Sequence, residues 1–256
     1  MKKLTAAVAG LALMLTGAAH AQSSLLDGWS GSANLGLTFV RGDAESDSVA
    51  AGIRISKTVG KWEHLLFGSL IHGSTTVVIA NPPAPSELIE ADSAERLLIG
   101  YQPKYYWRPR TYFFGLFDFE TDEPGNIDTA FTQIIGIGHK FWTRGEDSYF
   151  AGEAGIGNSS LEPEVGPDVD SAILYGALNY RYKFSEAALF YSDFRADIGD
   201  DNTAIDWNSG VSFKLSSRLA VNLSLLIYGN TDLDDNTNPL DEDFNQVFTA
   251  GLVFDI

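Results

Sequence analysis

The chain has 256 residues, no cysteine and a formal net charge of −17 at pH 7. So acidic a chain repels the phosphate backbone of nucleic acids, and nucleic-acid binding is not expected. Without cysteine, no disulfide contributes to stability. After the N-terminal region no apolar run reaches the ~18 residues of a membrane-spanning helix. A closed β-barrel stays open as an alternative, because it also satisfies every backbone polar group within a bilayer.

Residues 1–21 have the features of a secretory signal peptide. Two lysines precede an apolar run, and Ala19-His20-Ala21 forms a small-residue cleavage site. The apolar run is too short to cross a bilayer as a helix. We therefore expect residues 22–256 to be the exported domain.

From Trp29 onward, apolar and polar residues alternate with the two-residue period of strands that have one apolar face. Near the C-terminus, for example, Leu223 and Leu225 flank Ser224 and follow Asn222. Most segments are long for a soluble sheet but suit tilted strands that cross a bilayer. The twelve expected strands are 29–40, 48–59, 62–76, 93–107, 111–120, 128–142, 148–159, 170–183, 186–197, 204–215, 218–230 and 245–256.

The connections between these segments alternate strictly between long and short. The long connections are rich in aspartate and glutamate, whereas lysines and arginines gather near the short turns. Outer-membrane barrels have long loops on the outer side and tight turns on the periplasmic side. The pattern predicts an all-β, antiparallel up-and-down transmembrane barrel of about 12 strands. Its outer end should be acidic and its periplasmic end more basic.

Tryptophans support this orientation, because amphipathic rings favour the membrane interface. Trp29, Trp62, Trp107 and Trp142 fall beside the short turns, and Trp207 lies toward the other end. The alternative is a soluble periplasmic barrel or sandwich, which would need fewer and shorter strands with inward apolar faces. The polar faces here favour the outer membrane of a Gram-negative bacterium.

Charged and amide side chains on the polar faces are candidates to line the lumen. They could form salt bridges that fill the barrel, or line a narrow pore that selects ions. A barrel of about twelve strands lies between small filled barrels and open porins, so both alternatives stay open. The candidates are Arg54, Arg96, Glu153, Asn179, Arg181, Asp193, Arg195 and Asn208.

Four glycines on two neighbouring expected strands are interpreted as structural. They do not form a nucleotide-binding fingerprint, because no strand runs into a helix here. Facing the lumen, they would leave room for an aromatic ring such as that of Tyr175 or Tyr191. These glycines are Gly136, Gly138, Gly155 and Gly157.

Candidate catalytic residues are sparse. His72 and Ser74 lie two apart on one expected strand, a spacing similar to that in outer-membrane phospholipases. The surrounding motif and an orienting asparagine are missing. We therefore expect no enzymatic activity, with a hydrolase at the barrel rim as the remote alternative.

The last long connection has the spacing of a calcium-binding loop. Asp232, Asp234, Asn236 and Asp243 occupy four ligand positions, but Thr237 stands where the EF-hand loop needs glycine, and strands rather than helices flank it. Weak Ca²⁺ or Mg²⁺ binding shared among acidic outer loops is therefore expected in place of a dedicated site. No other cofactor is expected.

Several short motifs together resemble one family, the uncharacterised outer-membrane barrels labelled salt-induced outer membrane proteins. The resemblance covers nearly all of residues 22–256 and implies an outer-membrane location without an established activity. The motifs are Trp29-x-Gly31, Leu35-Gly36, Gly60-Lys61-Trp62, Gly136-Ile137-Gly138 and Glu153-x-Gly155-x-Gly157.

The C-terminal strand is similar to the signal read by the outer-membrane assembly machinery, with Phe254 two residues before Ile256. The expected partners are therefore this machinery, outer-membrane lipid and lipopolysaccharide. The expected function is a structural or salt- or stress-related envelope barrel, and the alternative is a narrow channel for ions or small solutes.

Overall fold

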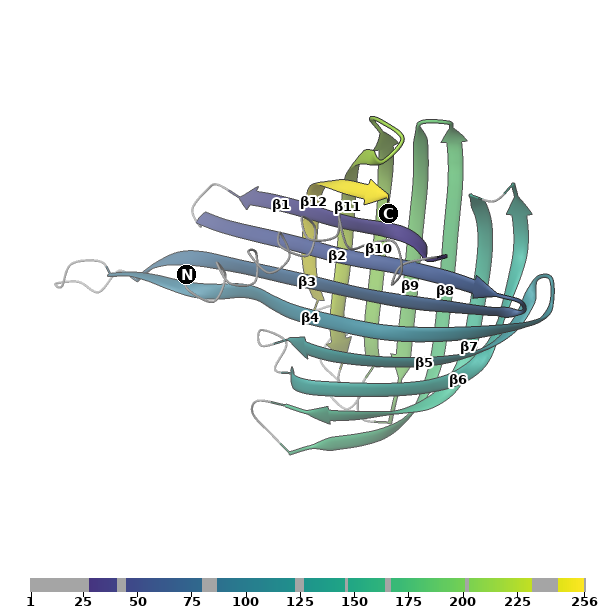
Figure 1. Ribbon diagram of the computed structural model, residues 1–256. Coiled ribbons are helices and arrows are strands. Elements are labelled where there is room, and N and C mark those ends of the chain that lie inside the picture. Colours follow the sequence, from purple (N-terminus) through teal and green to yellow (C-terminus); the bar gives the residue numbers. More distant parts are fainter. Residues whose placement is uncertain are drawn as a thin grey trace.

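Twelve antiparallel strands form one closed barrel in the computed structural model, which describes residues 28–40, 45–79, 87–122, 127–145, 147–163, 167–200, 203–231 and 244–255. Each strand pairs with its neighbours in the chain, and β1 closes the barrel against β12 (Figure 1). The strands are β1 Ser30–Val40, β2 Glu45–Val59, β3 Trp62–Ile79, β4 Glu87–Arg108, β5 Thr111–Asp122, β6 Ile127–Arg144, β7 Ser148–Glu162, β8 Val169–Ser185, β9 Ala188–Ile198, β10 Thr203–Lys214, β11 Leu219–Thr231 and β12 Phe244–Asp255.

The predicted all-β, up-and-down architecture is confirmed, and most strand ends differ from the predicted ones by three residues or fewer. The largest difference is the β3–β4 hairpin. Residues 77–79 and 87–92, expected in a connection, continue the ladder, with Val78 opposite Leu88. This hairpin extends beyond its neighbours in Figure 1. Within the described residues, no helix is long and apolar enough to cross a membrane.

The short turns lie together at one end of the barrel, here called the short-turn end. Gly60 and Gly145 take positive φ angles of 62° and 67° in two of these turns. Glycine adopts this conformation without the steric cost that a Cβ atom would add. The opposite end, where the long connections leave the strands, is called the long-connection end.

Strand β5 shows how the two faces differ. Tyr112, Phe114 and Leu116 are buried inside the barrel, whereas Phe113 and Phe117 on the outward face are 51% and 40% exposed. The same alternation leaves large apolar side chains exposed around the outside, including Ile135 and Ile156 on β6 and β7. An outward apolar band with a mixed interior is the pattern of membrane-spanning barrels.

An apolar cluster fills part of the interior beside β5, β6 and β8. Gly138 and Gly136 admit two of its rings, because an added Cβ would lie 2.3 Å from Tyr112 and 2.6 Å from Phe114. Gly136 and Gly138 thus make room for aromatic side chains, those of Phe114 and Tyr112 instead of Tyr175 or Tyr191, whereas Gly155 and Gly157 lie against Ile134. The buried members of the cluster are Tyr112, Phe114, Leu116, Ile134, Ile173, Tyr175 and Ala177.

Candidate functional site: the ion-paired lumen

The inner face carries a set of charged side chains that meet across the lumen. Antiparallel partners in register project to the same face of a sheet. Arg54 is opposite Phe67, which packs against the interior cluster, so Arg54 also points inward. By the same register, or by contacts across the lumen, the structure places all eight candidates on the inner face: Arg54, Arg96, Glu153, Asn179, Arg181, Asp193, Arg195 and Asn208.

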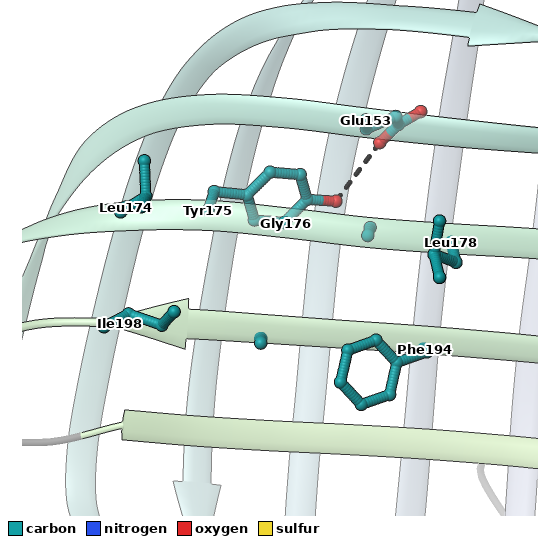
Figure 2. A pocket seen from close by; sticks show the side chains of 9 residues that line it. Glu153, Leu174, Tyr175, Gly176, Leu178, Phe194 and Ile198 are labelled. Atoms are coloured by element: carbon teal, nitrogen blue, oxygen red, sulfur yellow. Dashed lines mark hydrogen bonds between the residues drawn. The ribbon is translucent and has the colours of Figure 1, made fainter.

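Glu153 on β7 accepts four hydrogen bonds from three other strands. Its carboxylate receives Gln102 Nε2 and Lys104 Nζ at 2.8 Å each, Tyr112 OH at 2.7 Å and Tyr175 OH at 3.1 Å. Figure 2 shows the Tyr175 bond. The side chain is 2% exposed, and Lys104 compensates its charge. This set is called the Glu153 layer, and it joins strands β4, β5, β7 and β8.

Arg96 on β4 forms a second set of contacts, nearer the long-connection end. Its guanidinium donates to Glu120 Oε1 at 2.5 Å and lies 2.8 Å from Asp206 Oδ1, while stacking on the Tyr228 ring at 4.2 Å. The Arg96 side chain is 4% exposed. Since Glu120 lies on β5 and Asp206 on β10, one arginine ties a neighbouring strand to a distant one.

Arg195 on β9 makes a similar connection at the same level. It donates to Asp118 Oδ2 at 2.6 Å, across the lumen on β5, and to both carboxylate oxygens of Asp197 on its own strand. Two arginines and four carboxylates therefore share one layer, which leaves two formal negative charges in excess. This layer is called the arginine layer: Arg96, Asp118, Glu120, Arg195, Asp197 and Asp206.

The remaining candidates are less tightly held. Arg181 pairs with Asp193 through two bonds of 2.9 Å and 2.6 Å, and Asn179 is opposite Asp193 in the ladder. Arg54 is exposed, and no described residue forms an ion pair or hydrogen bond with it. The Oδ1 atom of Asn208 is buried without a hydrogen-bond partner among the described residues.

A second apolar contact bridges the lumen between β3 and β11. Ile71 and Tyr228 are both buried and pack with Ala50, Leu226 and Val247. The Arg96 guanidinium stacks on the Tyr228 ring, so this apolar contact lies next to the arginine layer. Ala50 and Val247 extend it to β2 and β12.

The outward face of β8 and β9 carries a hollow of about 250 Å³. Gly176 forms its floor, since an added Cβ would meet nothing within 4 Å. Leu174, Leu178 and Phe194 border it, as Figure 2 shows. The hollow is apolar and faces away from the lumen, so it belongs to the outer surface.

Sequence reasoning missed most partners of the eight candidates. Glu120, Asp197 and Asp206 were not among the predicted lumen residues, but they lie near strand ends and point into the lumen. Lys104 was assigned to the basic short-turn end, although its ammonium reaches Glu153 inside the barrel. The two-residue period of a strand could have found two of these partners. Asp118 and Glu120 are two residues apart and share the inward face of β5 with Tyr112.

Other candidates lie apart from this site or outside the described residues. The metal candidates Asp232, Asp234, Asn236 and Asp243, and the expected signal peptide 1–21, fall outside the described part of the chain. Among the residues that the structure describes, no group of three or more His, Cys, Asp or Glu side chains could hold a metal ion.

The histidine proposed for a rim hydrolase lies away from the lumen layers. His72 Nδ1 is 3.9 Å from Glu95 Oε2, and a register shift between Gly73 and Ser74 interrupts the ladder beside it. The side chain of Ser74 lies outside the described residues. The described contacts therefore supply no base and nucleophile pair at this position.

Fold and lumen together define the class of the protein, a closed twelve-stranded β-barrel of outer-membrane type with an ion-paired interior. The chain belongs to the family described as "Protein of unknown function, DUF481", which matches residues 33–255. No curated protein matches the chain.

Solved structures similar to this chain are outer-membrane barrels. The NanC porin is 7% identical with a TM-score of 0.50, and the match covers 88% of this chain and 100% of that one. The translocator domain of the autotransporter NalP from Neisseria meningitidis is 10% identical with a TM-score of 0.45, covering 99% and 97%. The KdgM porin is 9% identical with a TM-score of 0.43, covering 88% and 98%. At these identities only the fold is shared, and the NanC match is the one that supports it.

Proposed function

We propose that the protein is a structural envelope barrel of the Gram-negative outer membrane, related to salt or stress, with a lumen closed to general solutes. The observation that carries this proposal is the Arg96–Asp206 ion pair, which joins β4 to β10 across the lumen at 2.8 Å. The outward apolar band supports membrane insertion. The family resemblance supports the envelope role.

Energetics favour a lumen that stays closed. Twelve strands alone would enclose a space wider than a side-chain-filled small barrel. Here the ion pairs of the arginine layer cross that space, and breaking such a pair by removing one partner costs about 3–5 kcal/mol. A solute passing through the arginine layer would have to separate Arg96 from Asp206 or Arg195 from Asp118.

A swelling assay tests this proposal. Liposomes that contain the purified full chain are diluted into iso-osmotic solutions of small neutral sugars. We expect swelling no faster than in protein-free liposomes, because the arginine layer blocks the path. Sugar-dependent swelling at rates typical of a porin would contradict the closed lumen.

A narrow ion channel is the second candidate function. It is favoured by polar atoms on the inner face of β10 and β11. The buried Oδ1 atoms of Asn208 and Asn222 have no described partner, and water inside the lumen is one way to satisfy such acceptors. The two excess negative charges of the arginine layer would then favour cations. A reversal potential under a KCl gradient distinguishes the candidates, because only a conducting protein gives one.

The proposed partners follow from location. The acidic long connections are suited to divalent cations and to the cation-bridged surface of lipopolysaccharide. Strand β12, which closes the barrel, is proposed as the strand read by the assembly machinery. We propose no enzymatic role, and a lipase or protease activity that His72→Ala abolishes would be the minimum observation in favour of the hydrolase alternative.

A further inference from the structure

We propose that the barrel rim at the β4–β5 and β6–β7 turns binds the phosphate of an anionic phospholipid headgroup. The inference rests on the proposed membrane location, since this rim would then face the phospholipid leaflet on the periplasmic side. It names a binding site and a lipid class, which the barrel fold alone does not supply.

Three arginines lie along this part of the rim because β5 and β6 are paired. Thr111 is opposite His139 in the ladder, and Lys140 N donates to Arg110 O at 2.8 Å, so the two turns lie side by side. Arg110 Nη2 donates to Thr143 Oγ1 at 3.2 Å, which holds it toward the turn that carries Arg144. Arg108, Arg110 and Arg144 are all exposed. Guanidinium groups with a nearby hydroxyl are the groups that bind phosphate oxygens.

The charges of these arginines are not neutralised by their described surroundings. No described carboxylate lies within ion-pair distance of Arg108, Arg110 or Arg144. Asp147, three residues after Arg144 in the sequence, pairs with Lys183 at 2.9 Å. Glu146 lies outside the described residues. Three cations without a counter-ion among the described residues, in a chain of net charge −17, are suited to an anionic partner at this rim.

An aromatic border lies directly beside the arginines on the outward face. Trp107 stacks under Arg108 at 4.5 Å and contacts Phe113 at 5.8 Å between ring centroids. Phe141 and Trp142 on the neighbouring β6 strand are 57% and 37% exposed. Such rings mark the membrane interface, where headgroup phosphates lie. The border therefore sets the arginines at phosphate depth and offers apolar contacts to the upper acyl chains.

A quenching experiment on the full chain tests the proposal. The protein is reconstituted in phosphatidylcholine bilayers that contain increasing fractions of brominated phosphatidylglycerol, and in a parallel series brominated phosphatidylcholine. Bromine quenches tryptophans that it touches, and with Trp29, Trp62 and Trp207 replaced by phenylalanine in every protein compared, Trp107 and Trp142 alone report lipid at this rim. We expect a several-fold preference for phosphatidylglycerol. The triple variant Arg108→Gln, Arg110→Gln, Arg144→Gln should lose this preference.

A matched variant controls for charge alone. Lys61→Gln, Lys214→Gln and Arg218→Gln remove the same number of exposed cations from other short turns. The proposal requires that this control keep the preference, and an equal loss in both triples would overturn a local site. Competition by millimolar inorganic phosphate would assign the arginines to free phosphate and would also overturn it.

The same experiment separates a wrong membrane location from a wrong lipid site. If neither brominated lipid quenches the folded protein, the chain is not inserted, and the proposed location and this inference fall together. If both lipids quench equally, insertion stands and the anionic-lipid site alone is overturned.

Discussion

Arg96 on β4 and Asp206 on β10 form an ion pair of 2.8 Å between opposite walls of the barrel. Five strands separate β4 from β10 in either direction around the closed sheet. Two side chains can span this distance only where the lumen is narrow. The pair therefore acts as a tie across the interior of the barrel at this level.

This tie predicts energetic coupling between the two residues. Arg96→Gln and Asp206→Asn should each destabilise the barrel by about 3 kcal/mol, because each leaves a buried charge with fewer partners. The double variant should lose about 0.5–3 kcal/mol less than the sum of the single losses. Denaturant unfolding in phospholipid vesicles measures the free energy of unfolding of the native protein, both single variants and the double variant. Strictly additive losses would show that the pair does not couple the two walls.

The Glu153 layer predicts a second stability effect. Glu153→Gln should cost about 3–5 kcal/mol, since Lys104 would remain buried without a counter-charge. Glu186→Gln is the matched control, because Glu186 is 99% exposed at a turn. The same unfolding assay should find the control indistinguishable from the native protein. Equal stability of the Glu153→Gln variant would mean that the carboxylate is not ionised in this layer.

The outward face of β11 is tested by two neighbouring arginine substitutions. Leu223 is 37% exposed on the outward face, whereas Asn222 is buried inside and donates to Tyr191 OH at 2.9 Å. Leu223→Arg should cost about 2–4 kcal/mol near the bilayer midplane, and Ser224→Arg, on the same inner face as Asn222 but only half-buried, should be milder. The reverse order of stability would place Leu223 inside the barrel.

Two glycines predict opposite responses to the same small change. Gly138→Ala should destabilise by about 1–3 kcal/mol, because the new Cβ would lie 2.3 Å from the buried Tyr112 ring. Gly176→Ala should be tolerated, since its Cβ would enter the open hollow on the outward face. Thermal unfolding compares both with the native chain. Equal effects would contradict the placement of Gly138 against Tyr112.

The acidic connection after β11 predicts weak cation binding. Titration calorimetry with Ca²⁺ should detect millimolar affinity, because hard cations prefer carboxylate oxygens and the loop lacks the glycine and glutamate of a tight site. Asp232→Ala with Asp234→Ala should reduce the heat without changing barrel stability. No Ca²⁺ heat from the native protein would remove the metal proposal.

The sequence was sufficient to predict the barrel because one face of most strands is apolar and the other polar. Strands β3, β5 and β6 alternate least clearly in the sequence, and for β5 and β6 the structure gives a physical reason. Tyr112, Phe114 and Ile134 point into the interior cluster, so these strands are apolar on both faces and their two-residue period is obscured. The strand register and the short turns still bounded them correctly to within a few residues.

The lumen contacts could be predicted only in part. Alternation indicated that Arg96 and Arg195 point inward, but it carries no information about which distant strand each side chain reaches. Asp206 and Glu120 lie near strand ends that adjoin the acidic connections, and composition gave no sign that they point into the lumen. Their role follows from the closure and narrowing of the barrel, which is a property of all twelve strands together.

Single-channel recording tests the closed lumen most directly. The native protein and the Arg96→Gln variant are compared in planar bilayers, with and without Ca²⁺. Breaking the cross-barrel tie should produce current steps in the variant, whereas the native protein should give no stable unitary conductance in either condition. Stable unitary steps from the native protein would contradict the account.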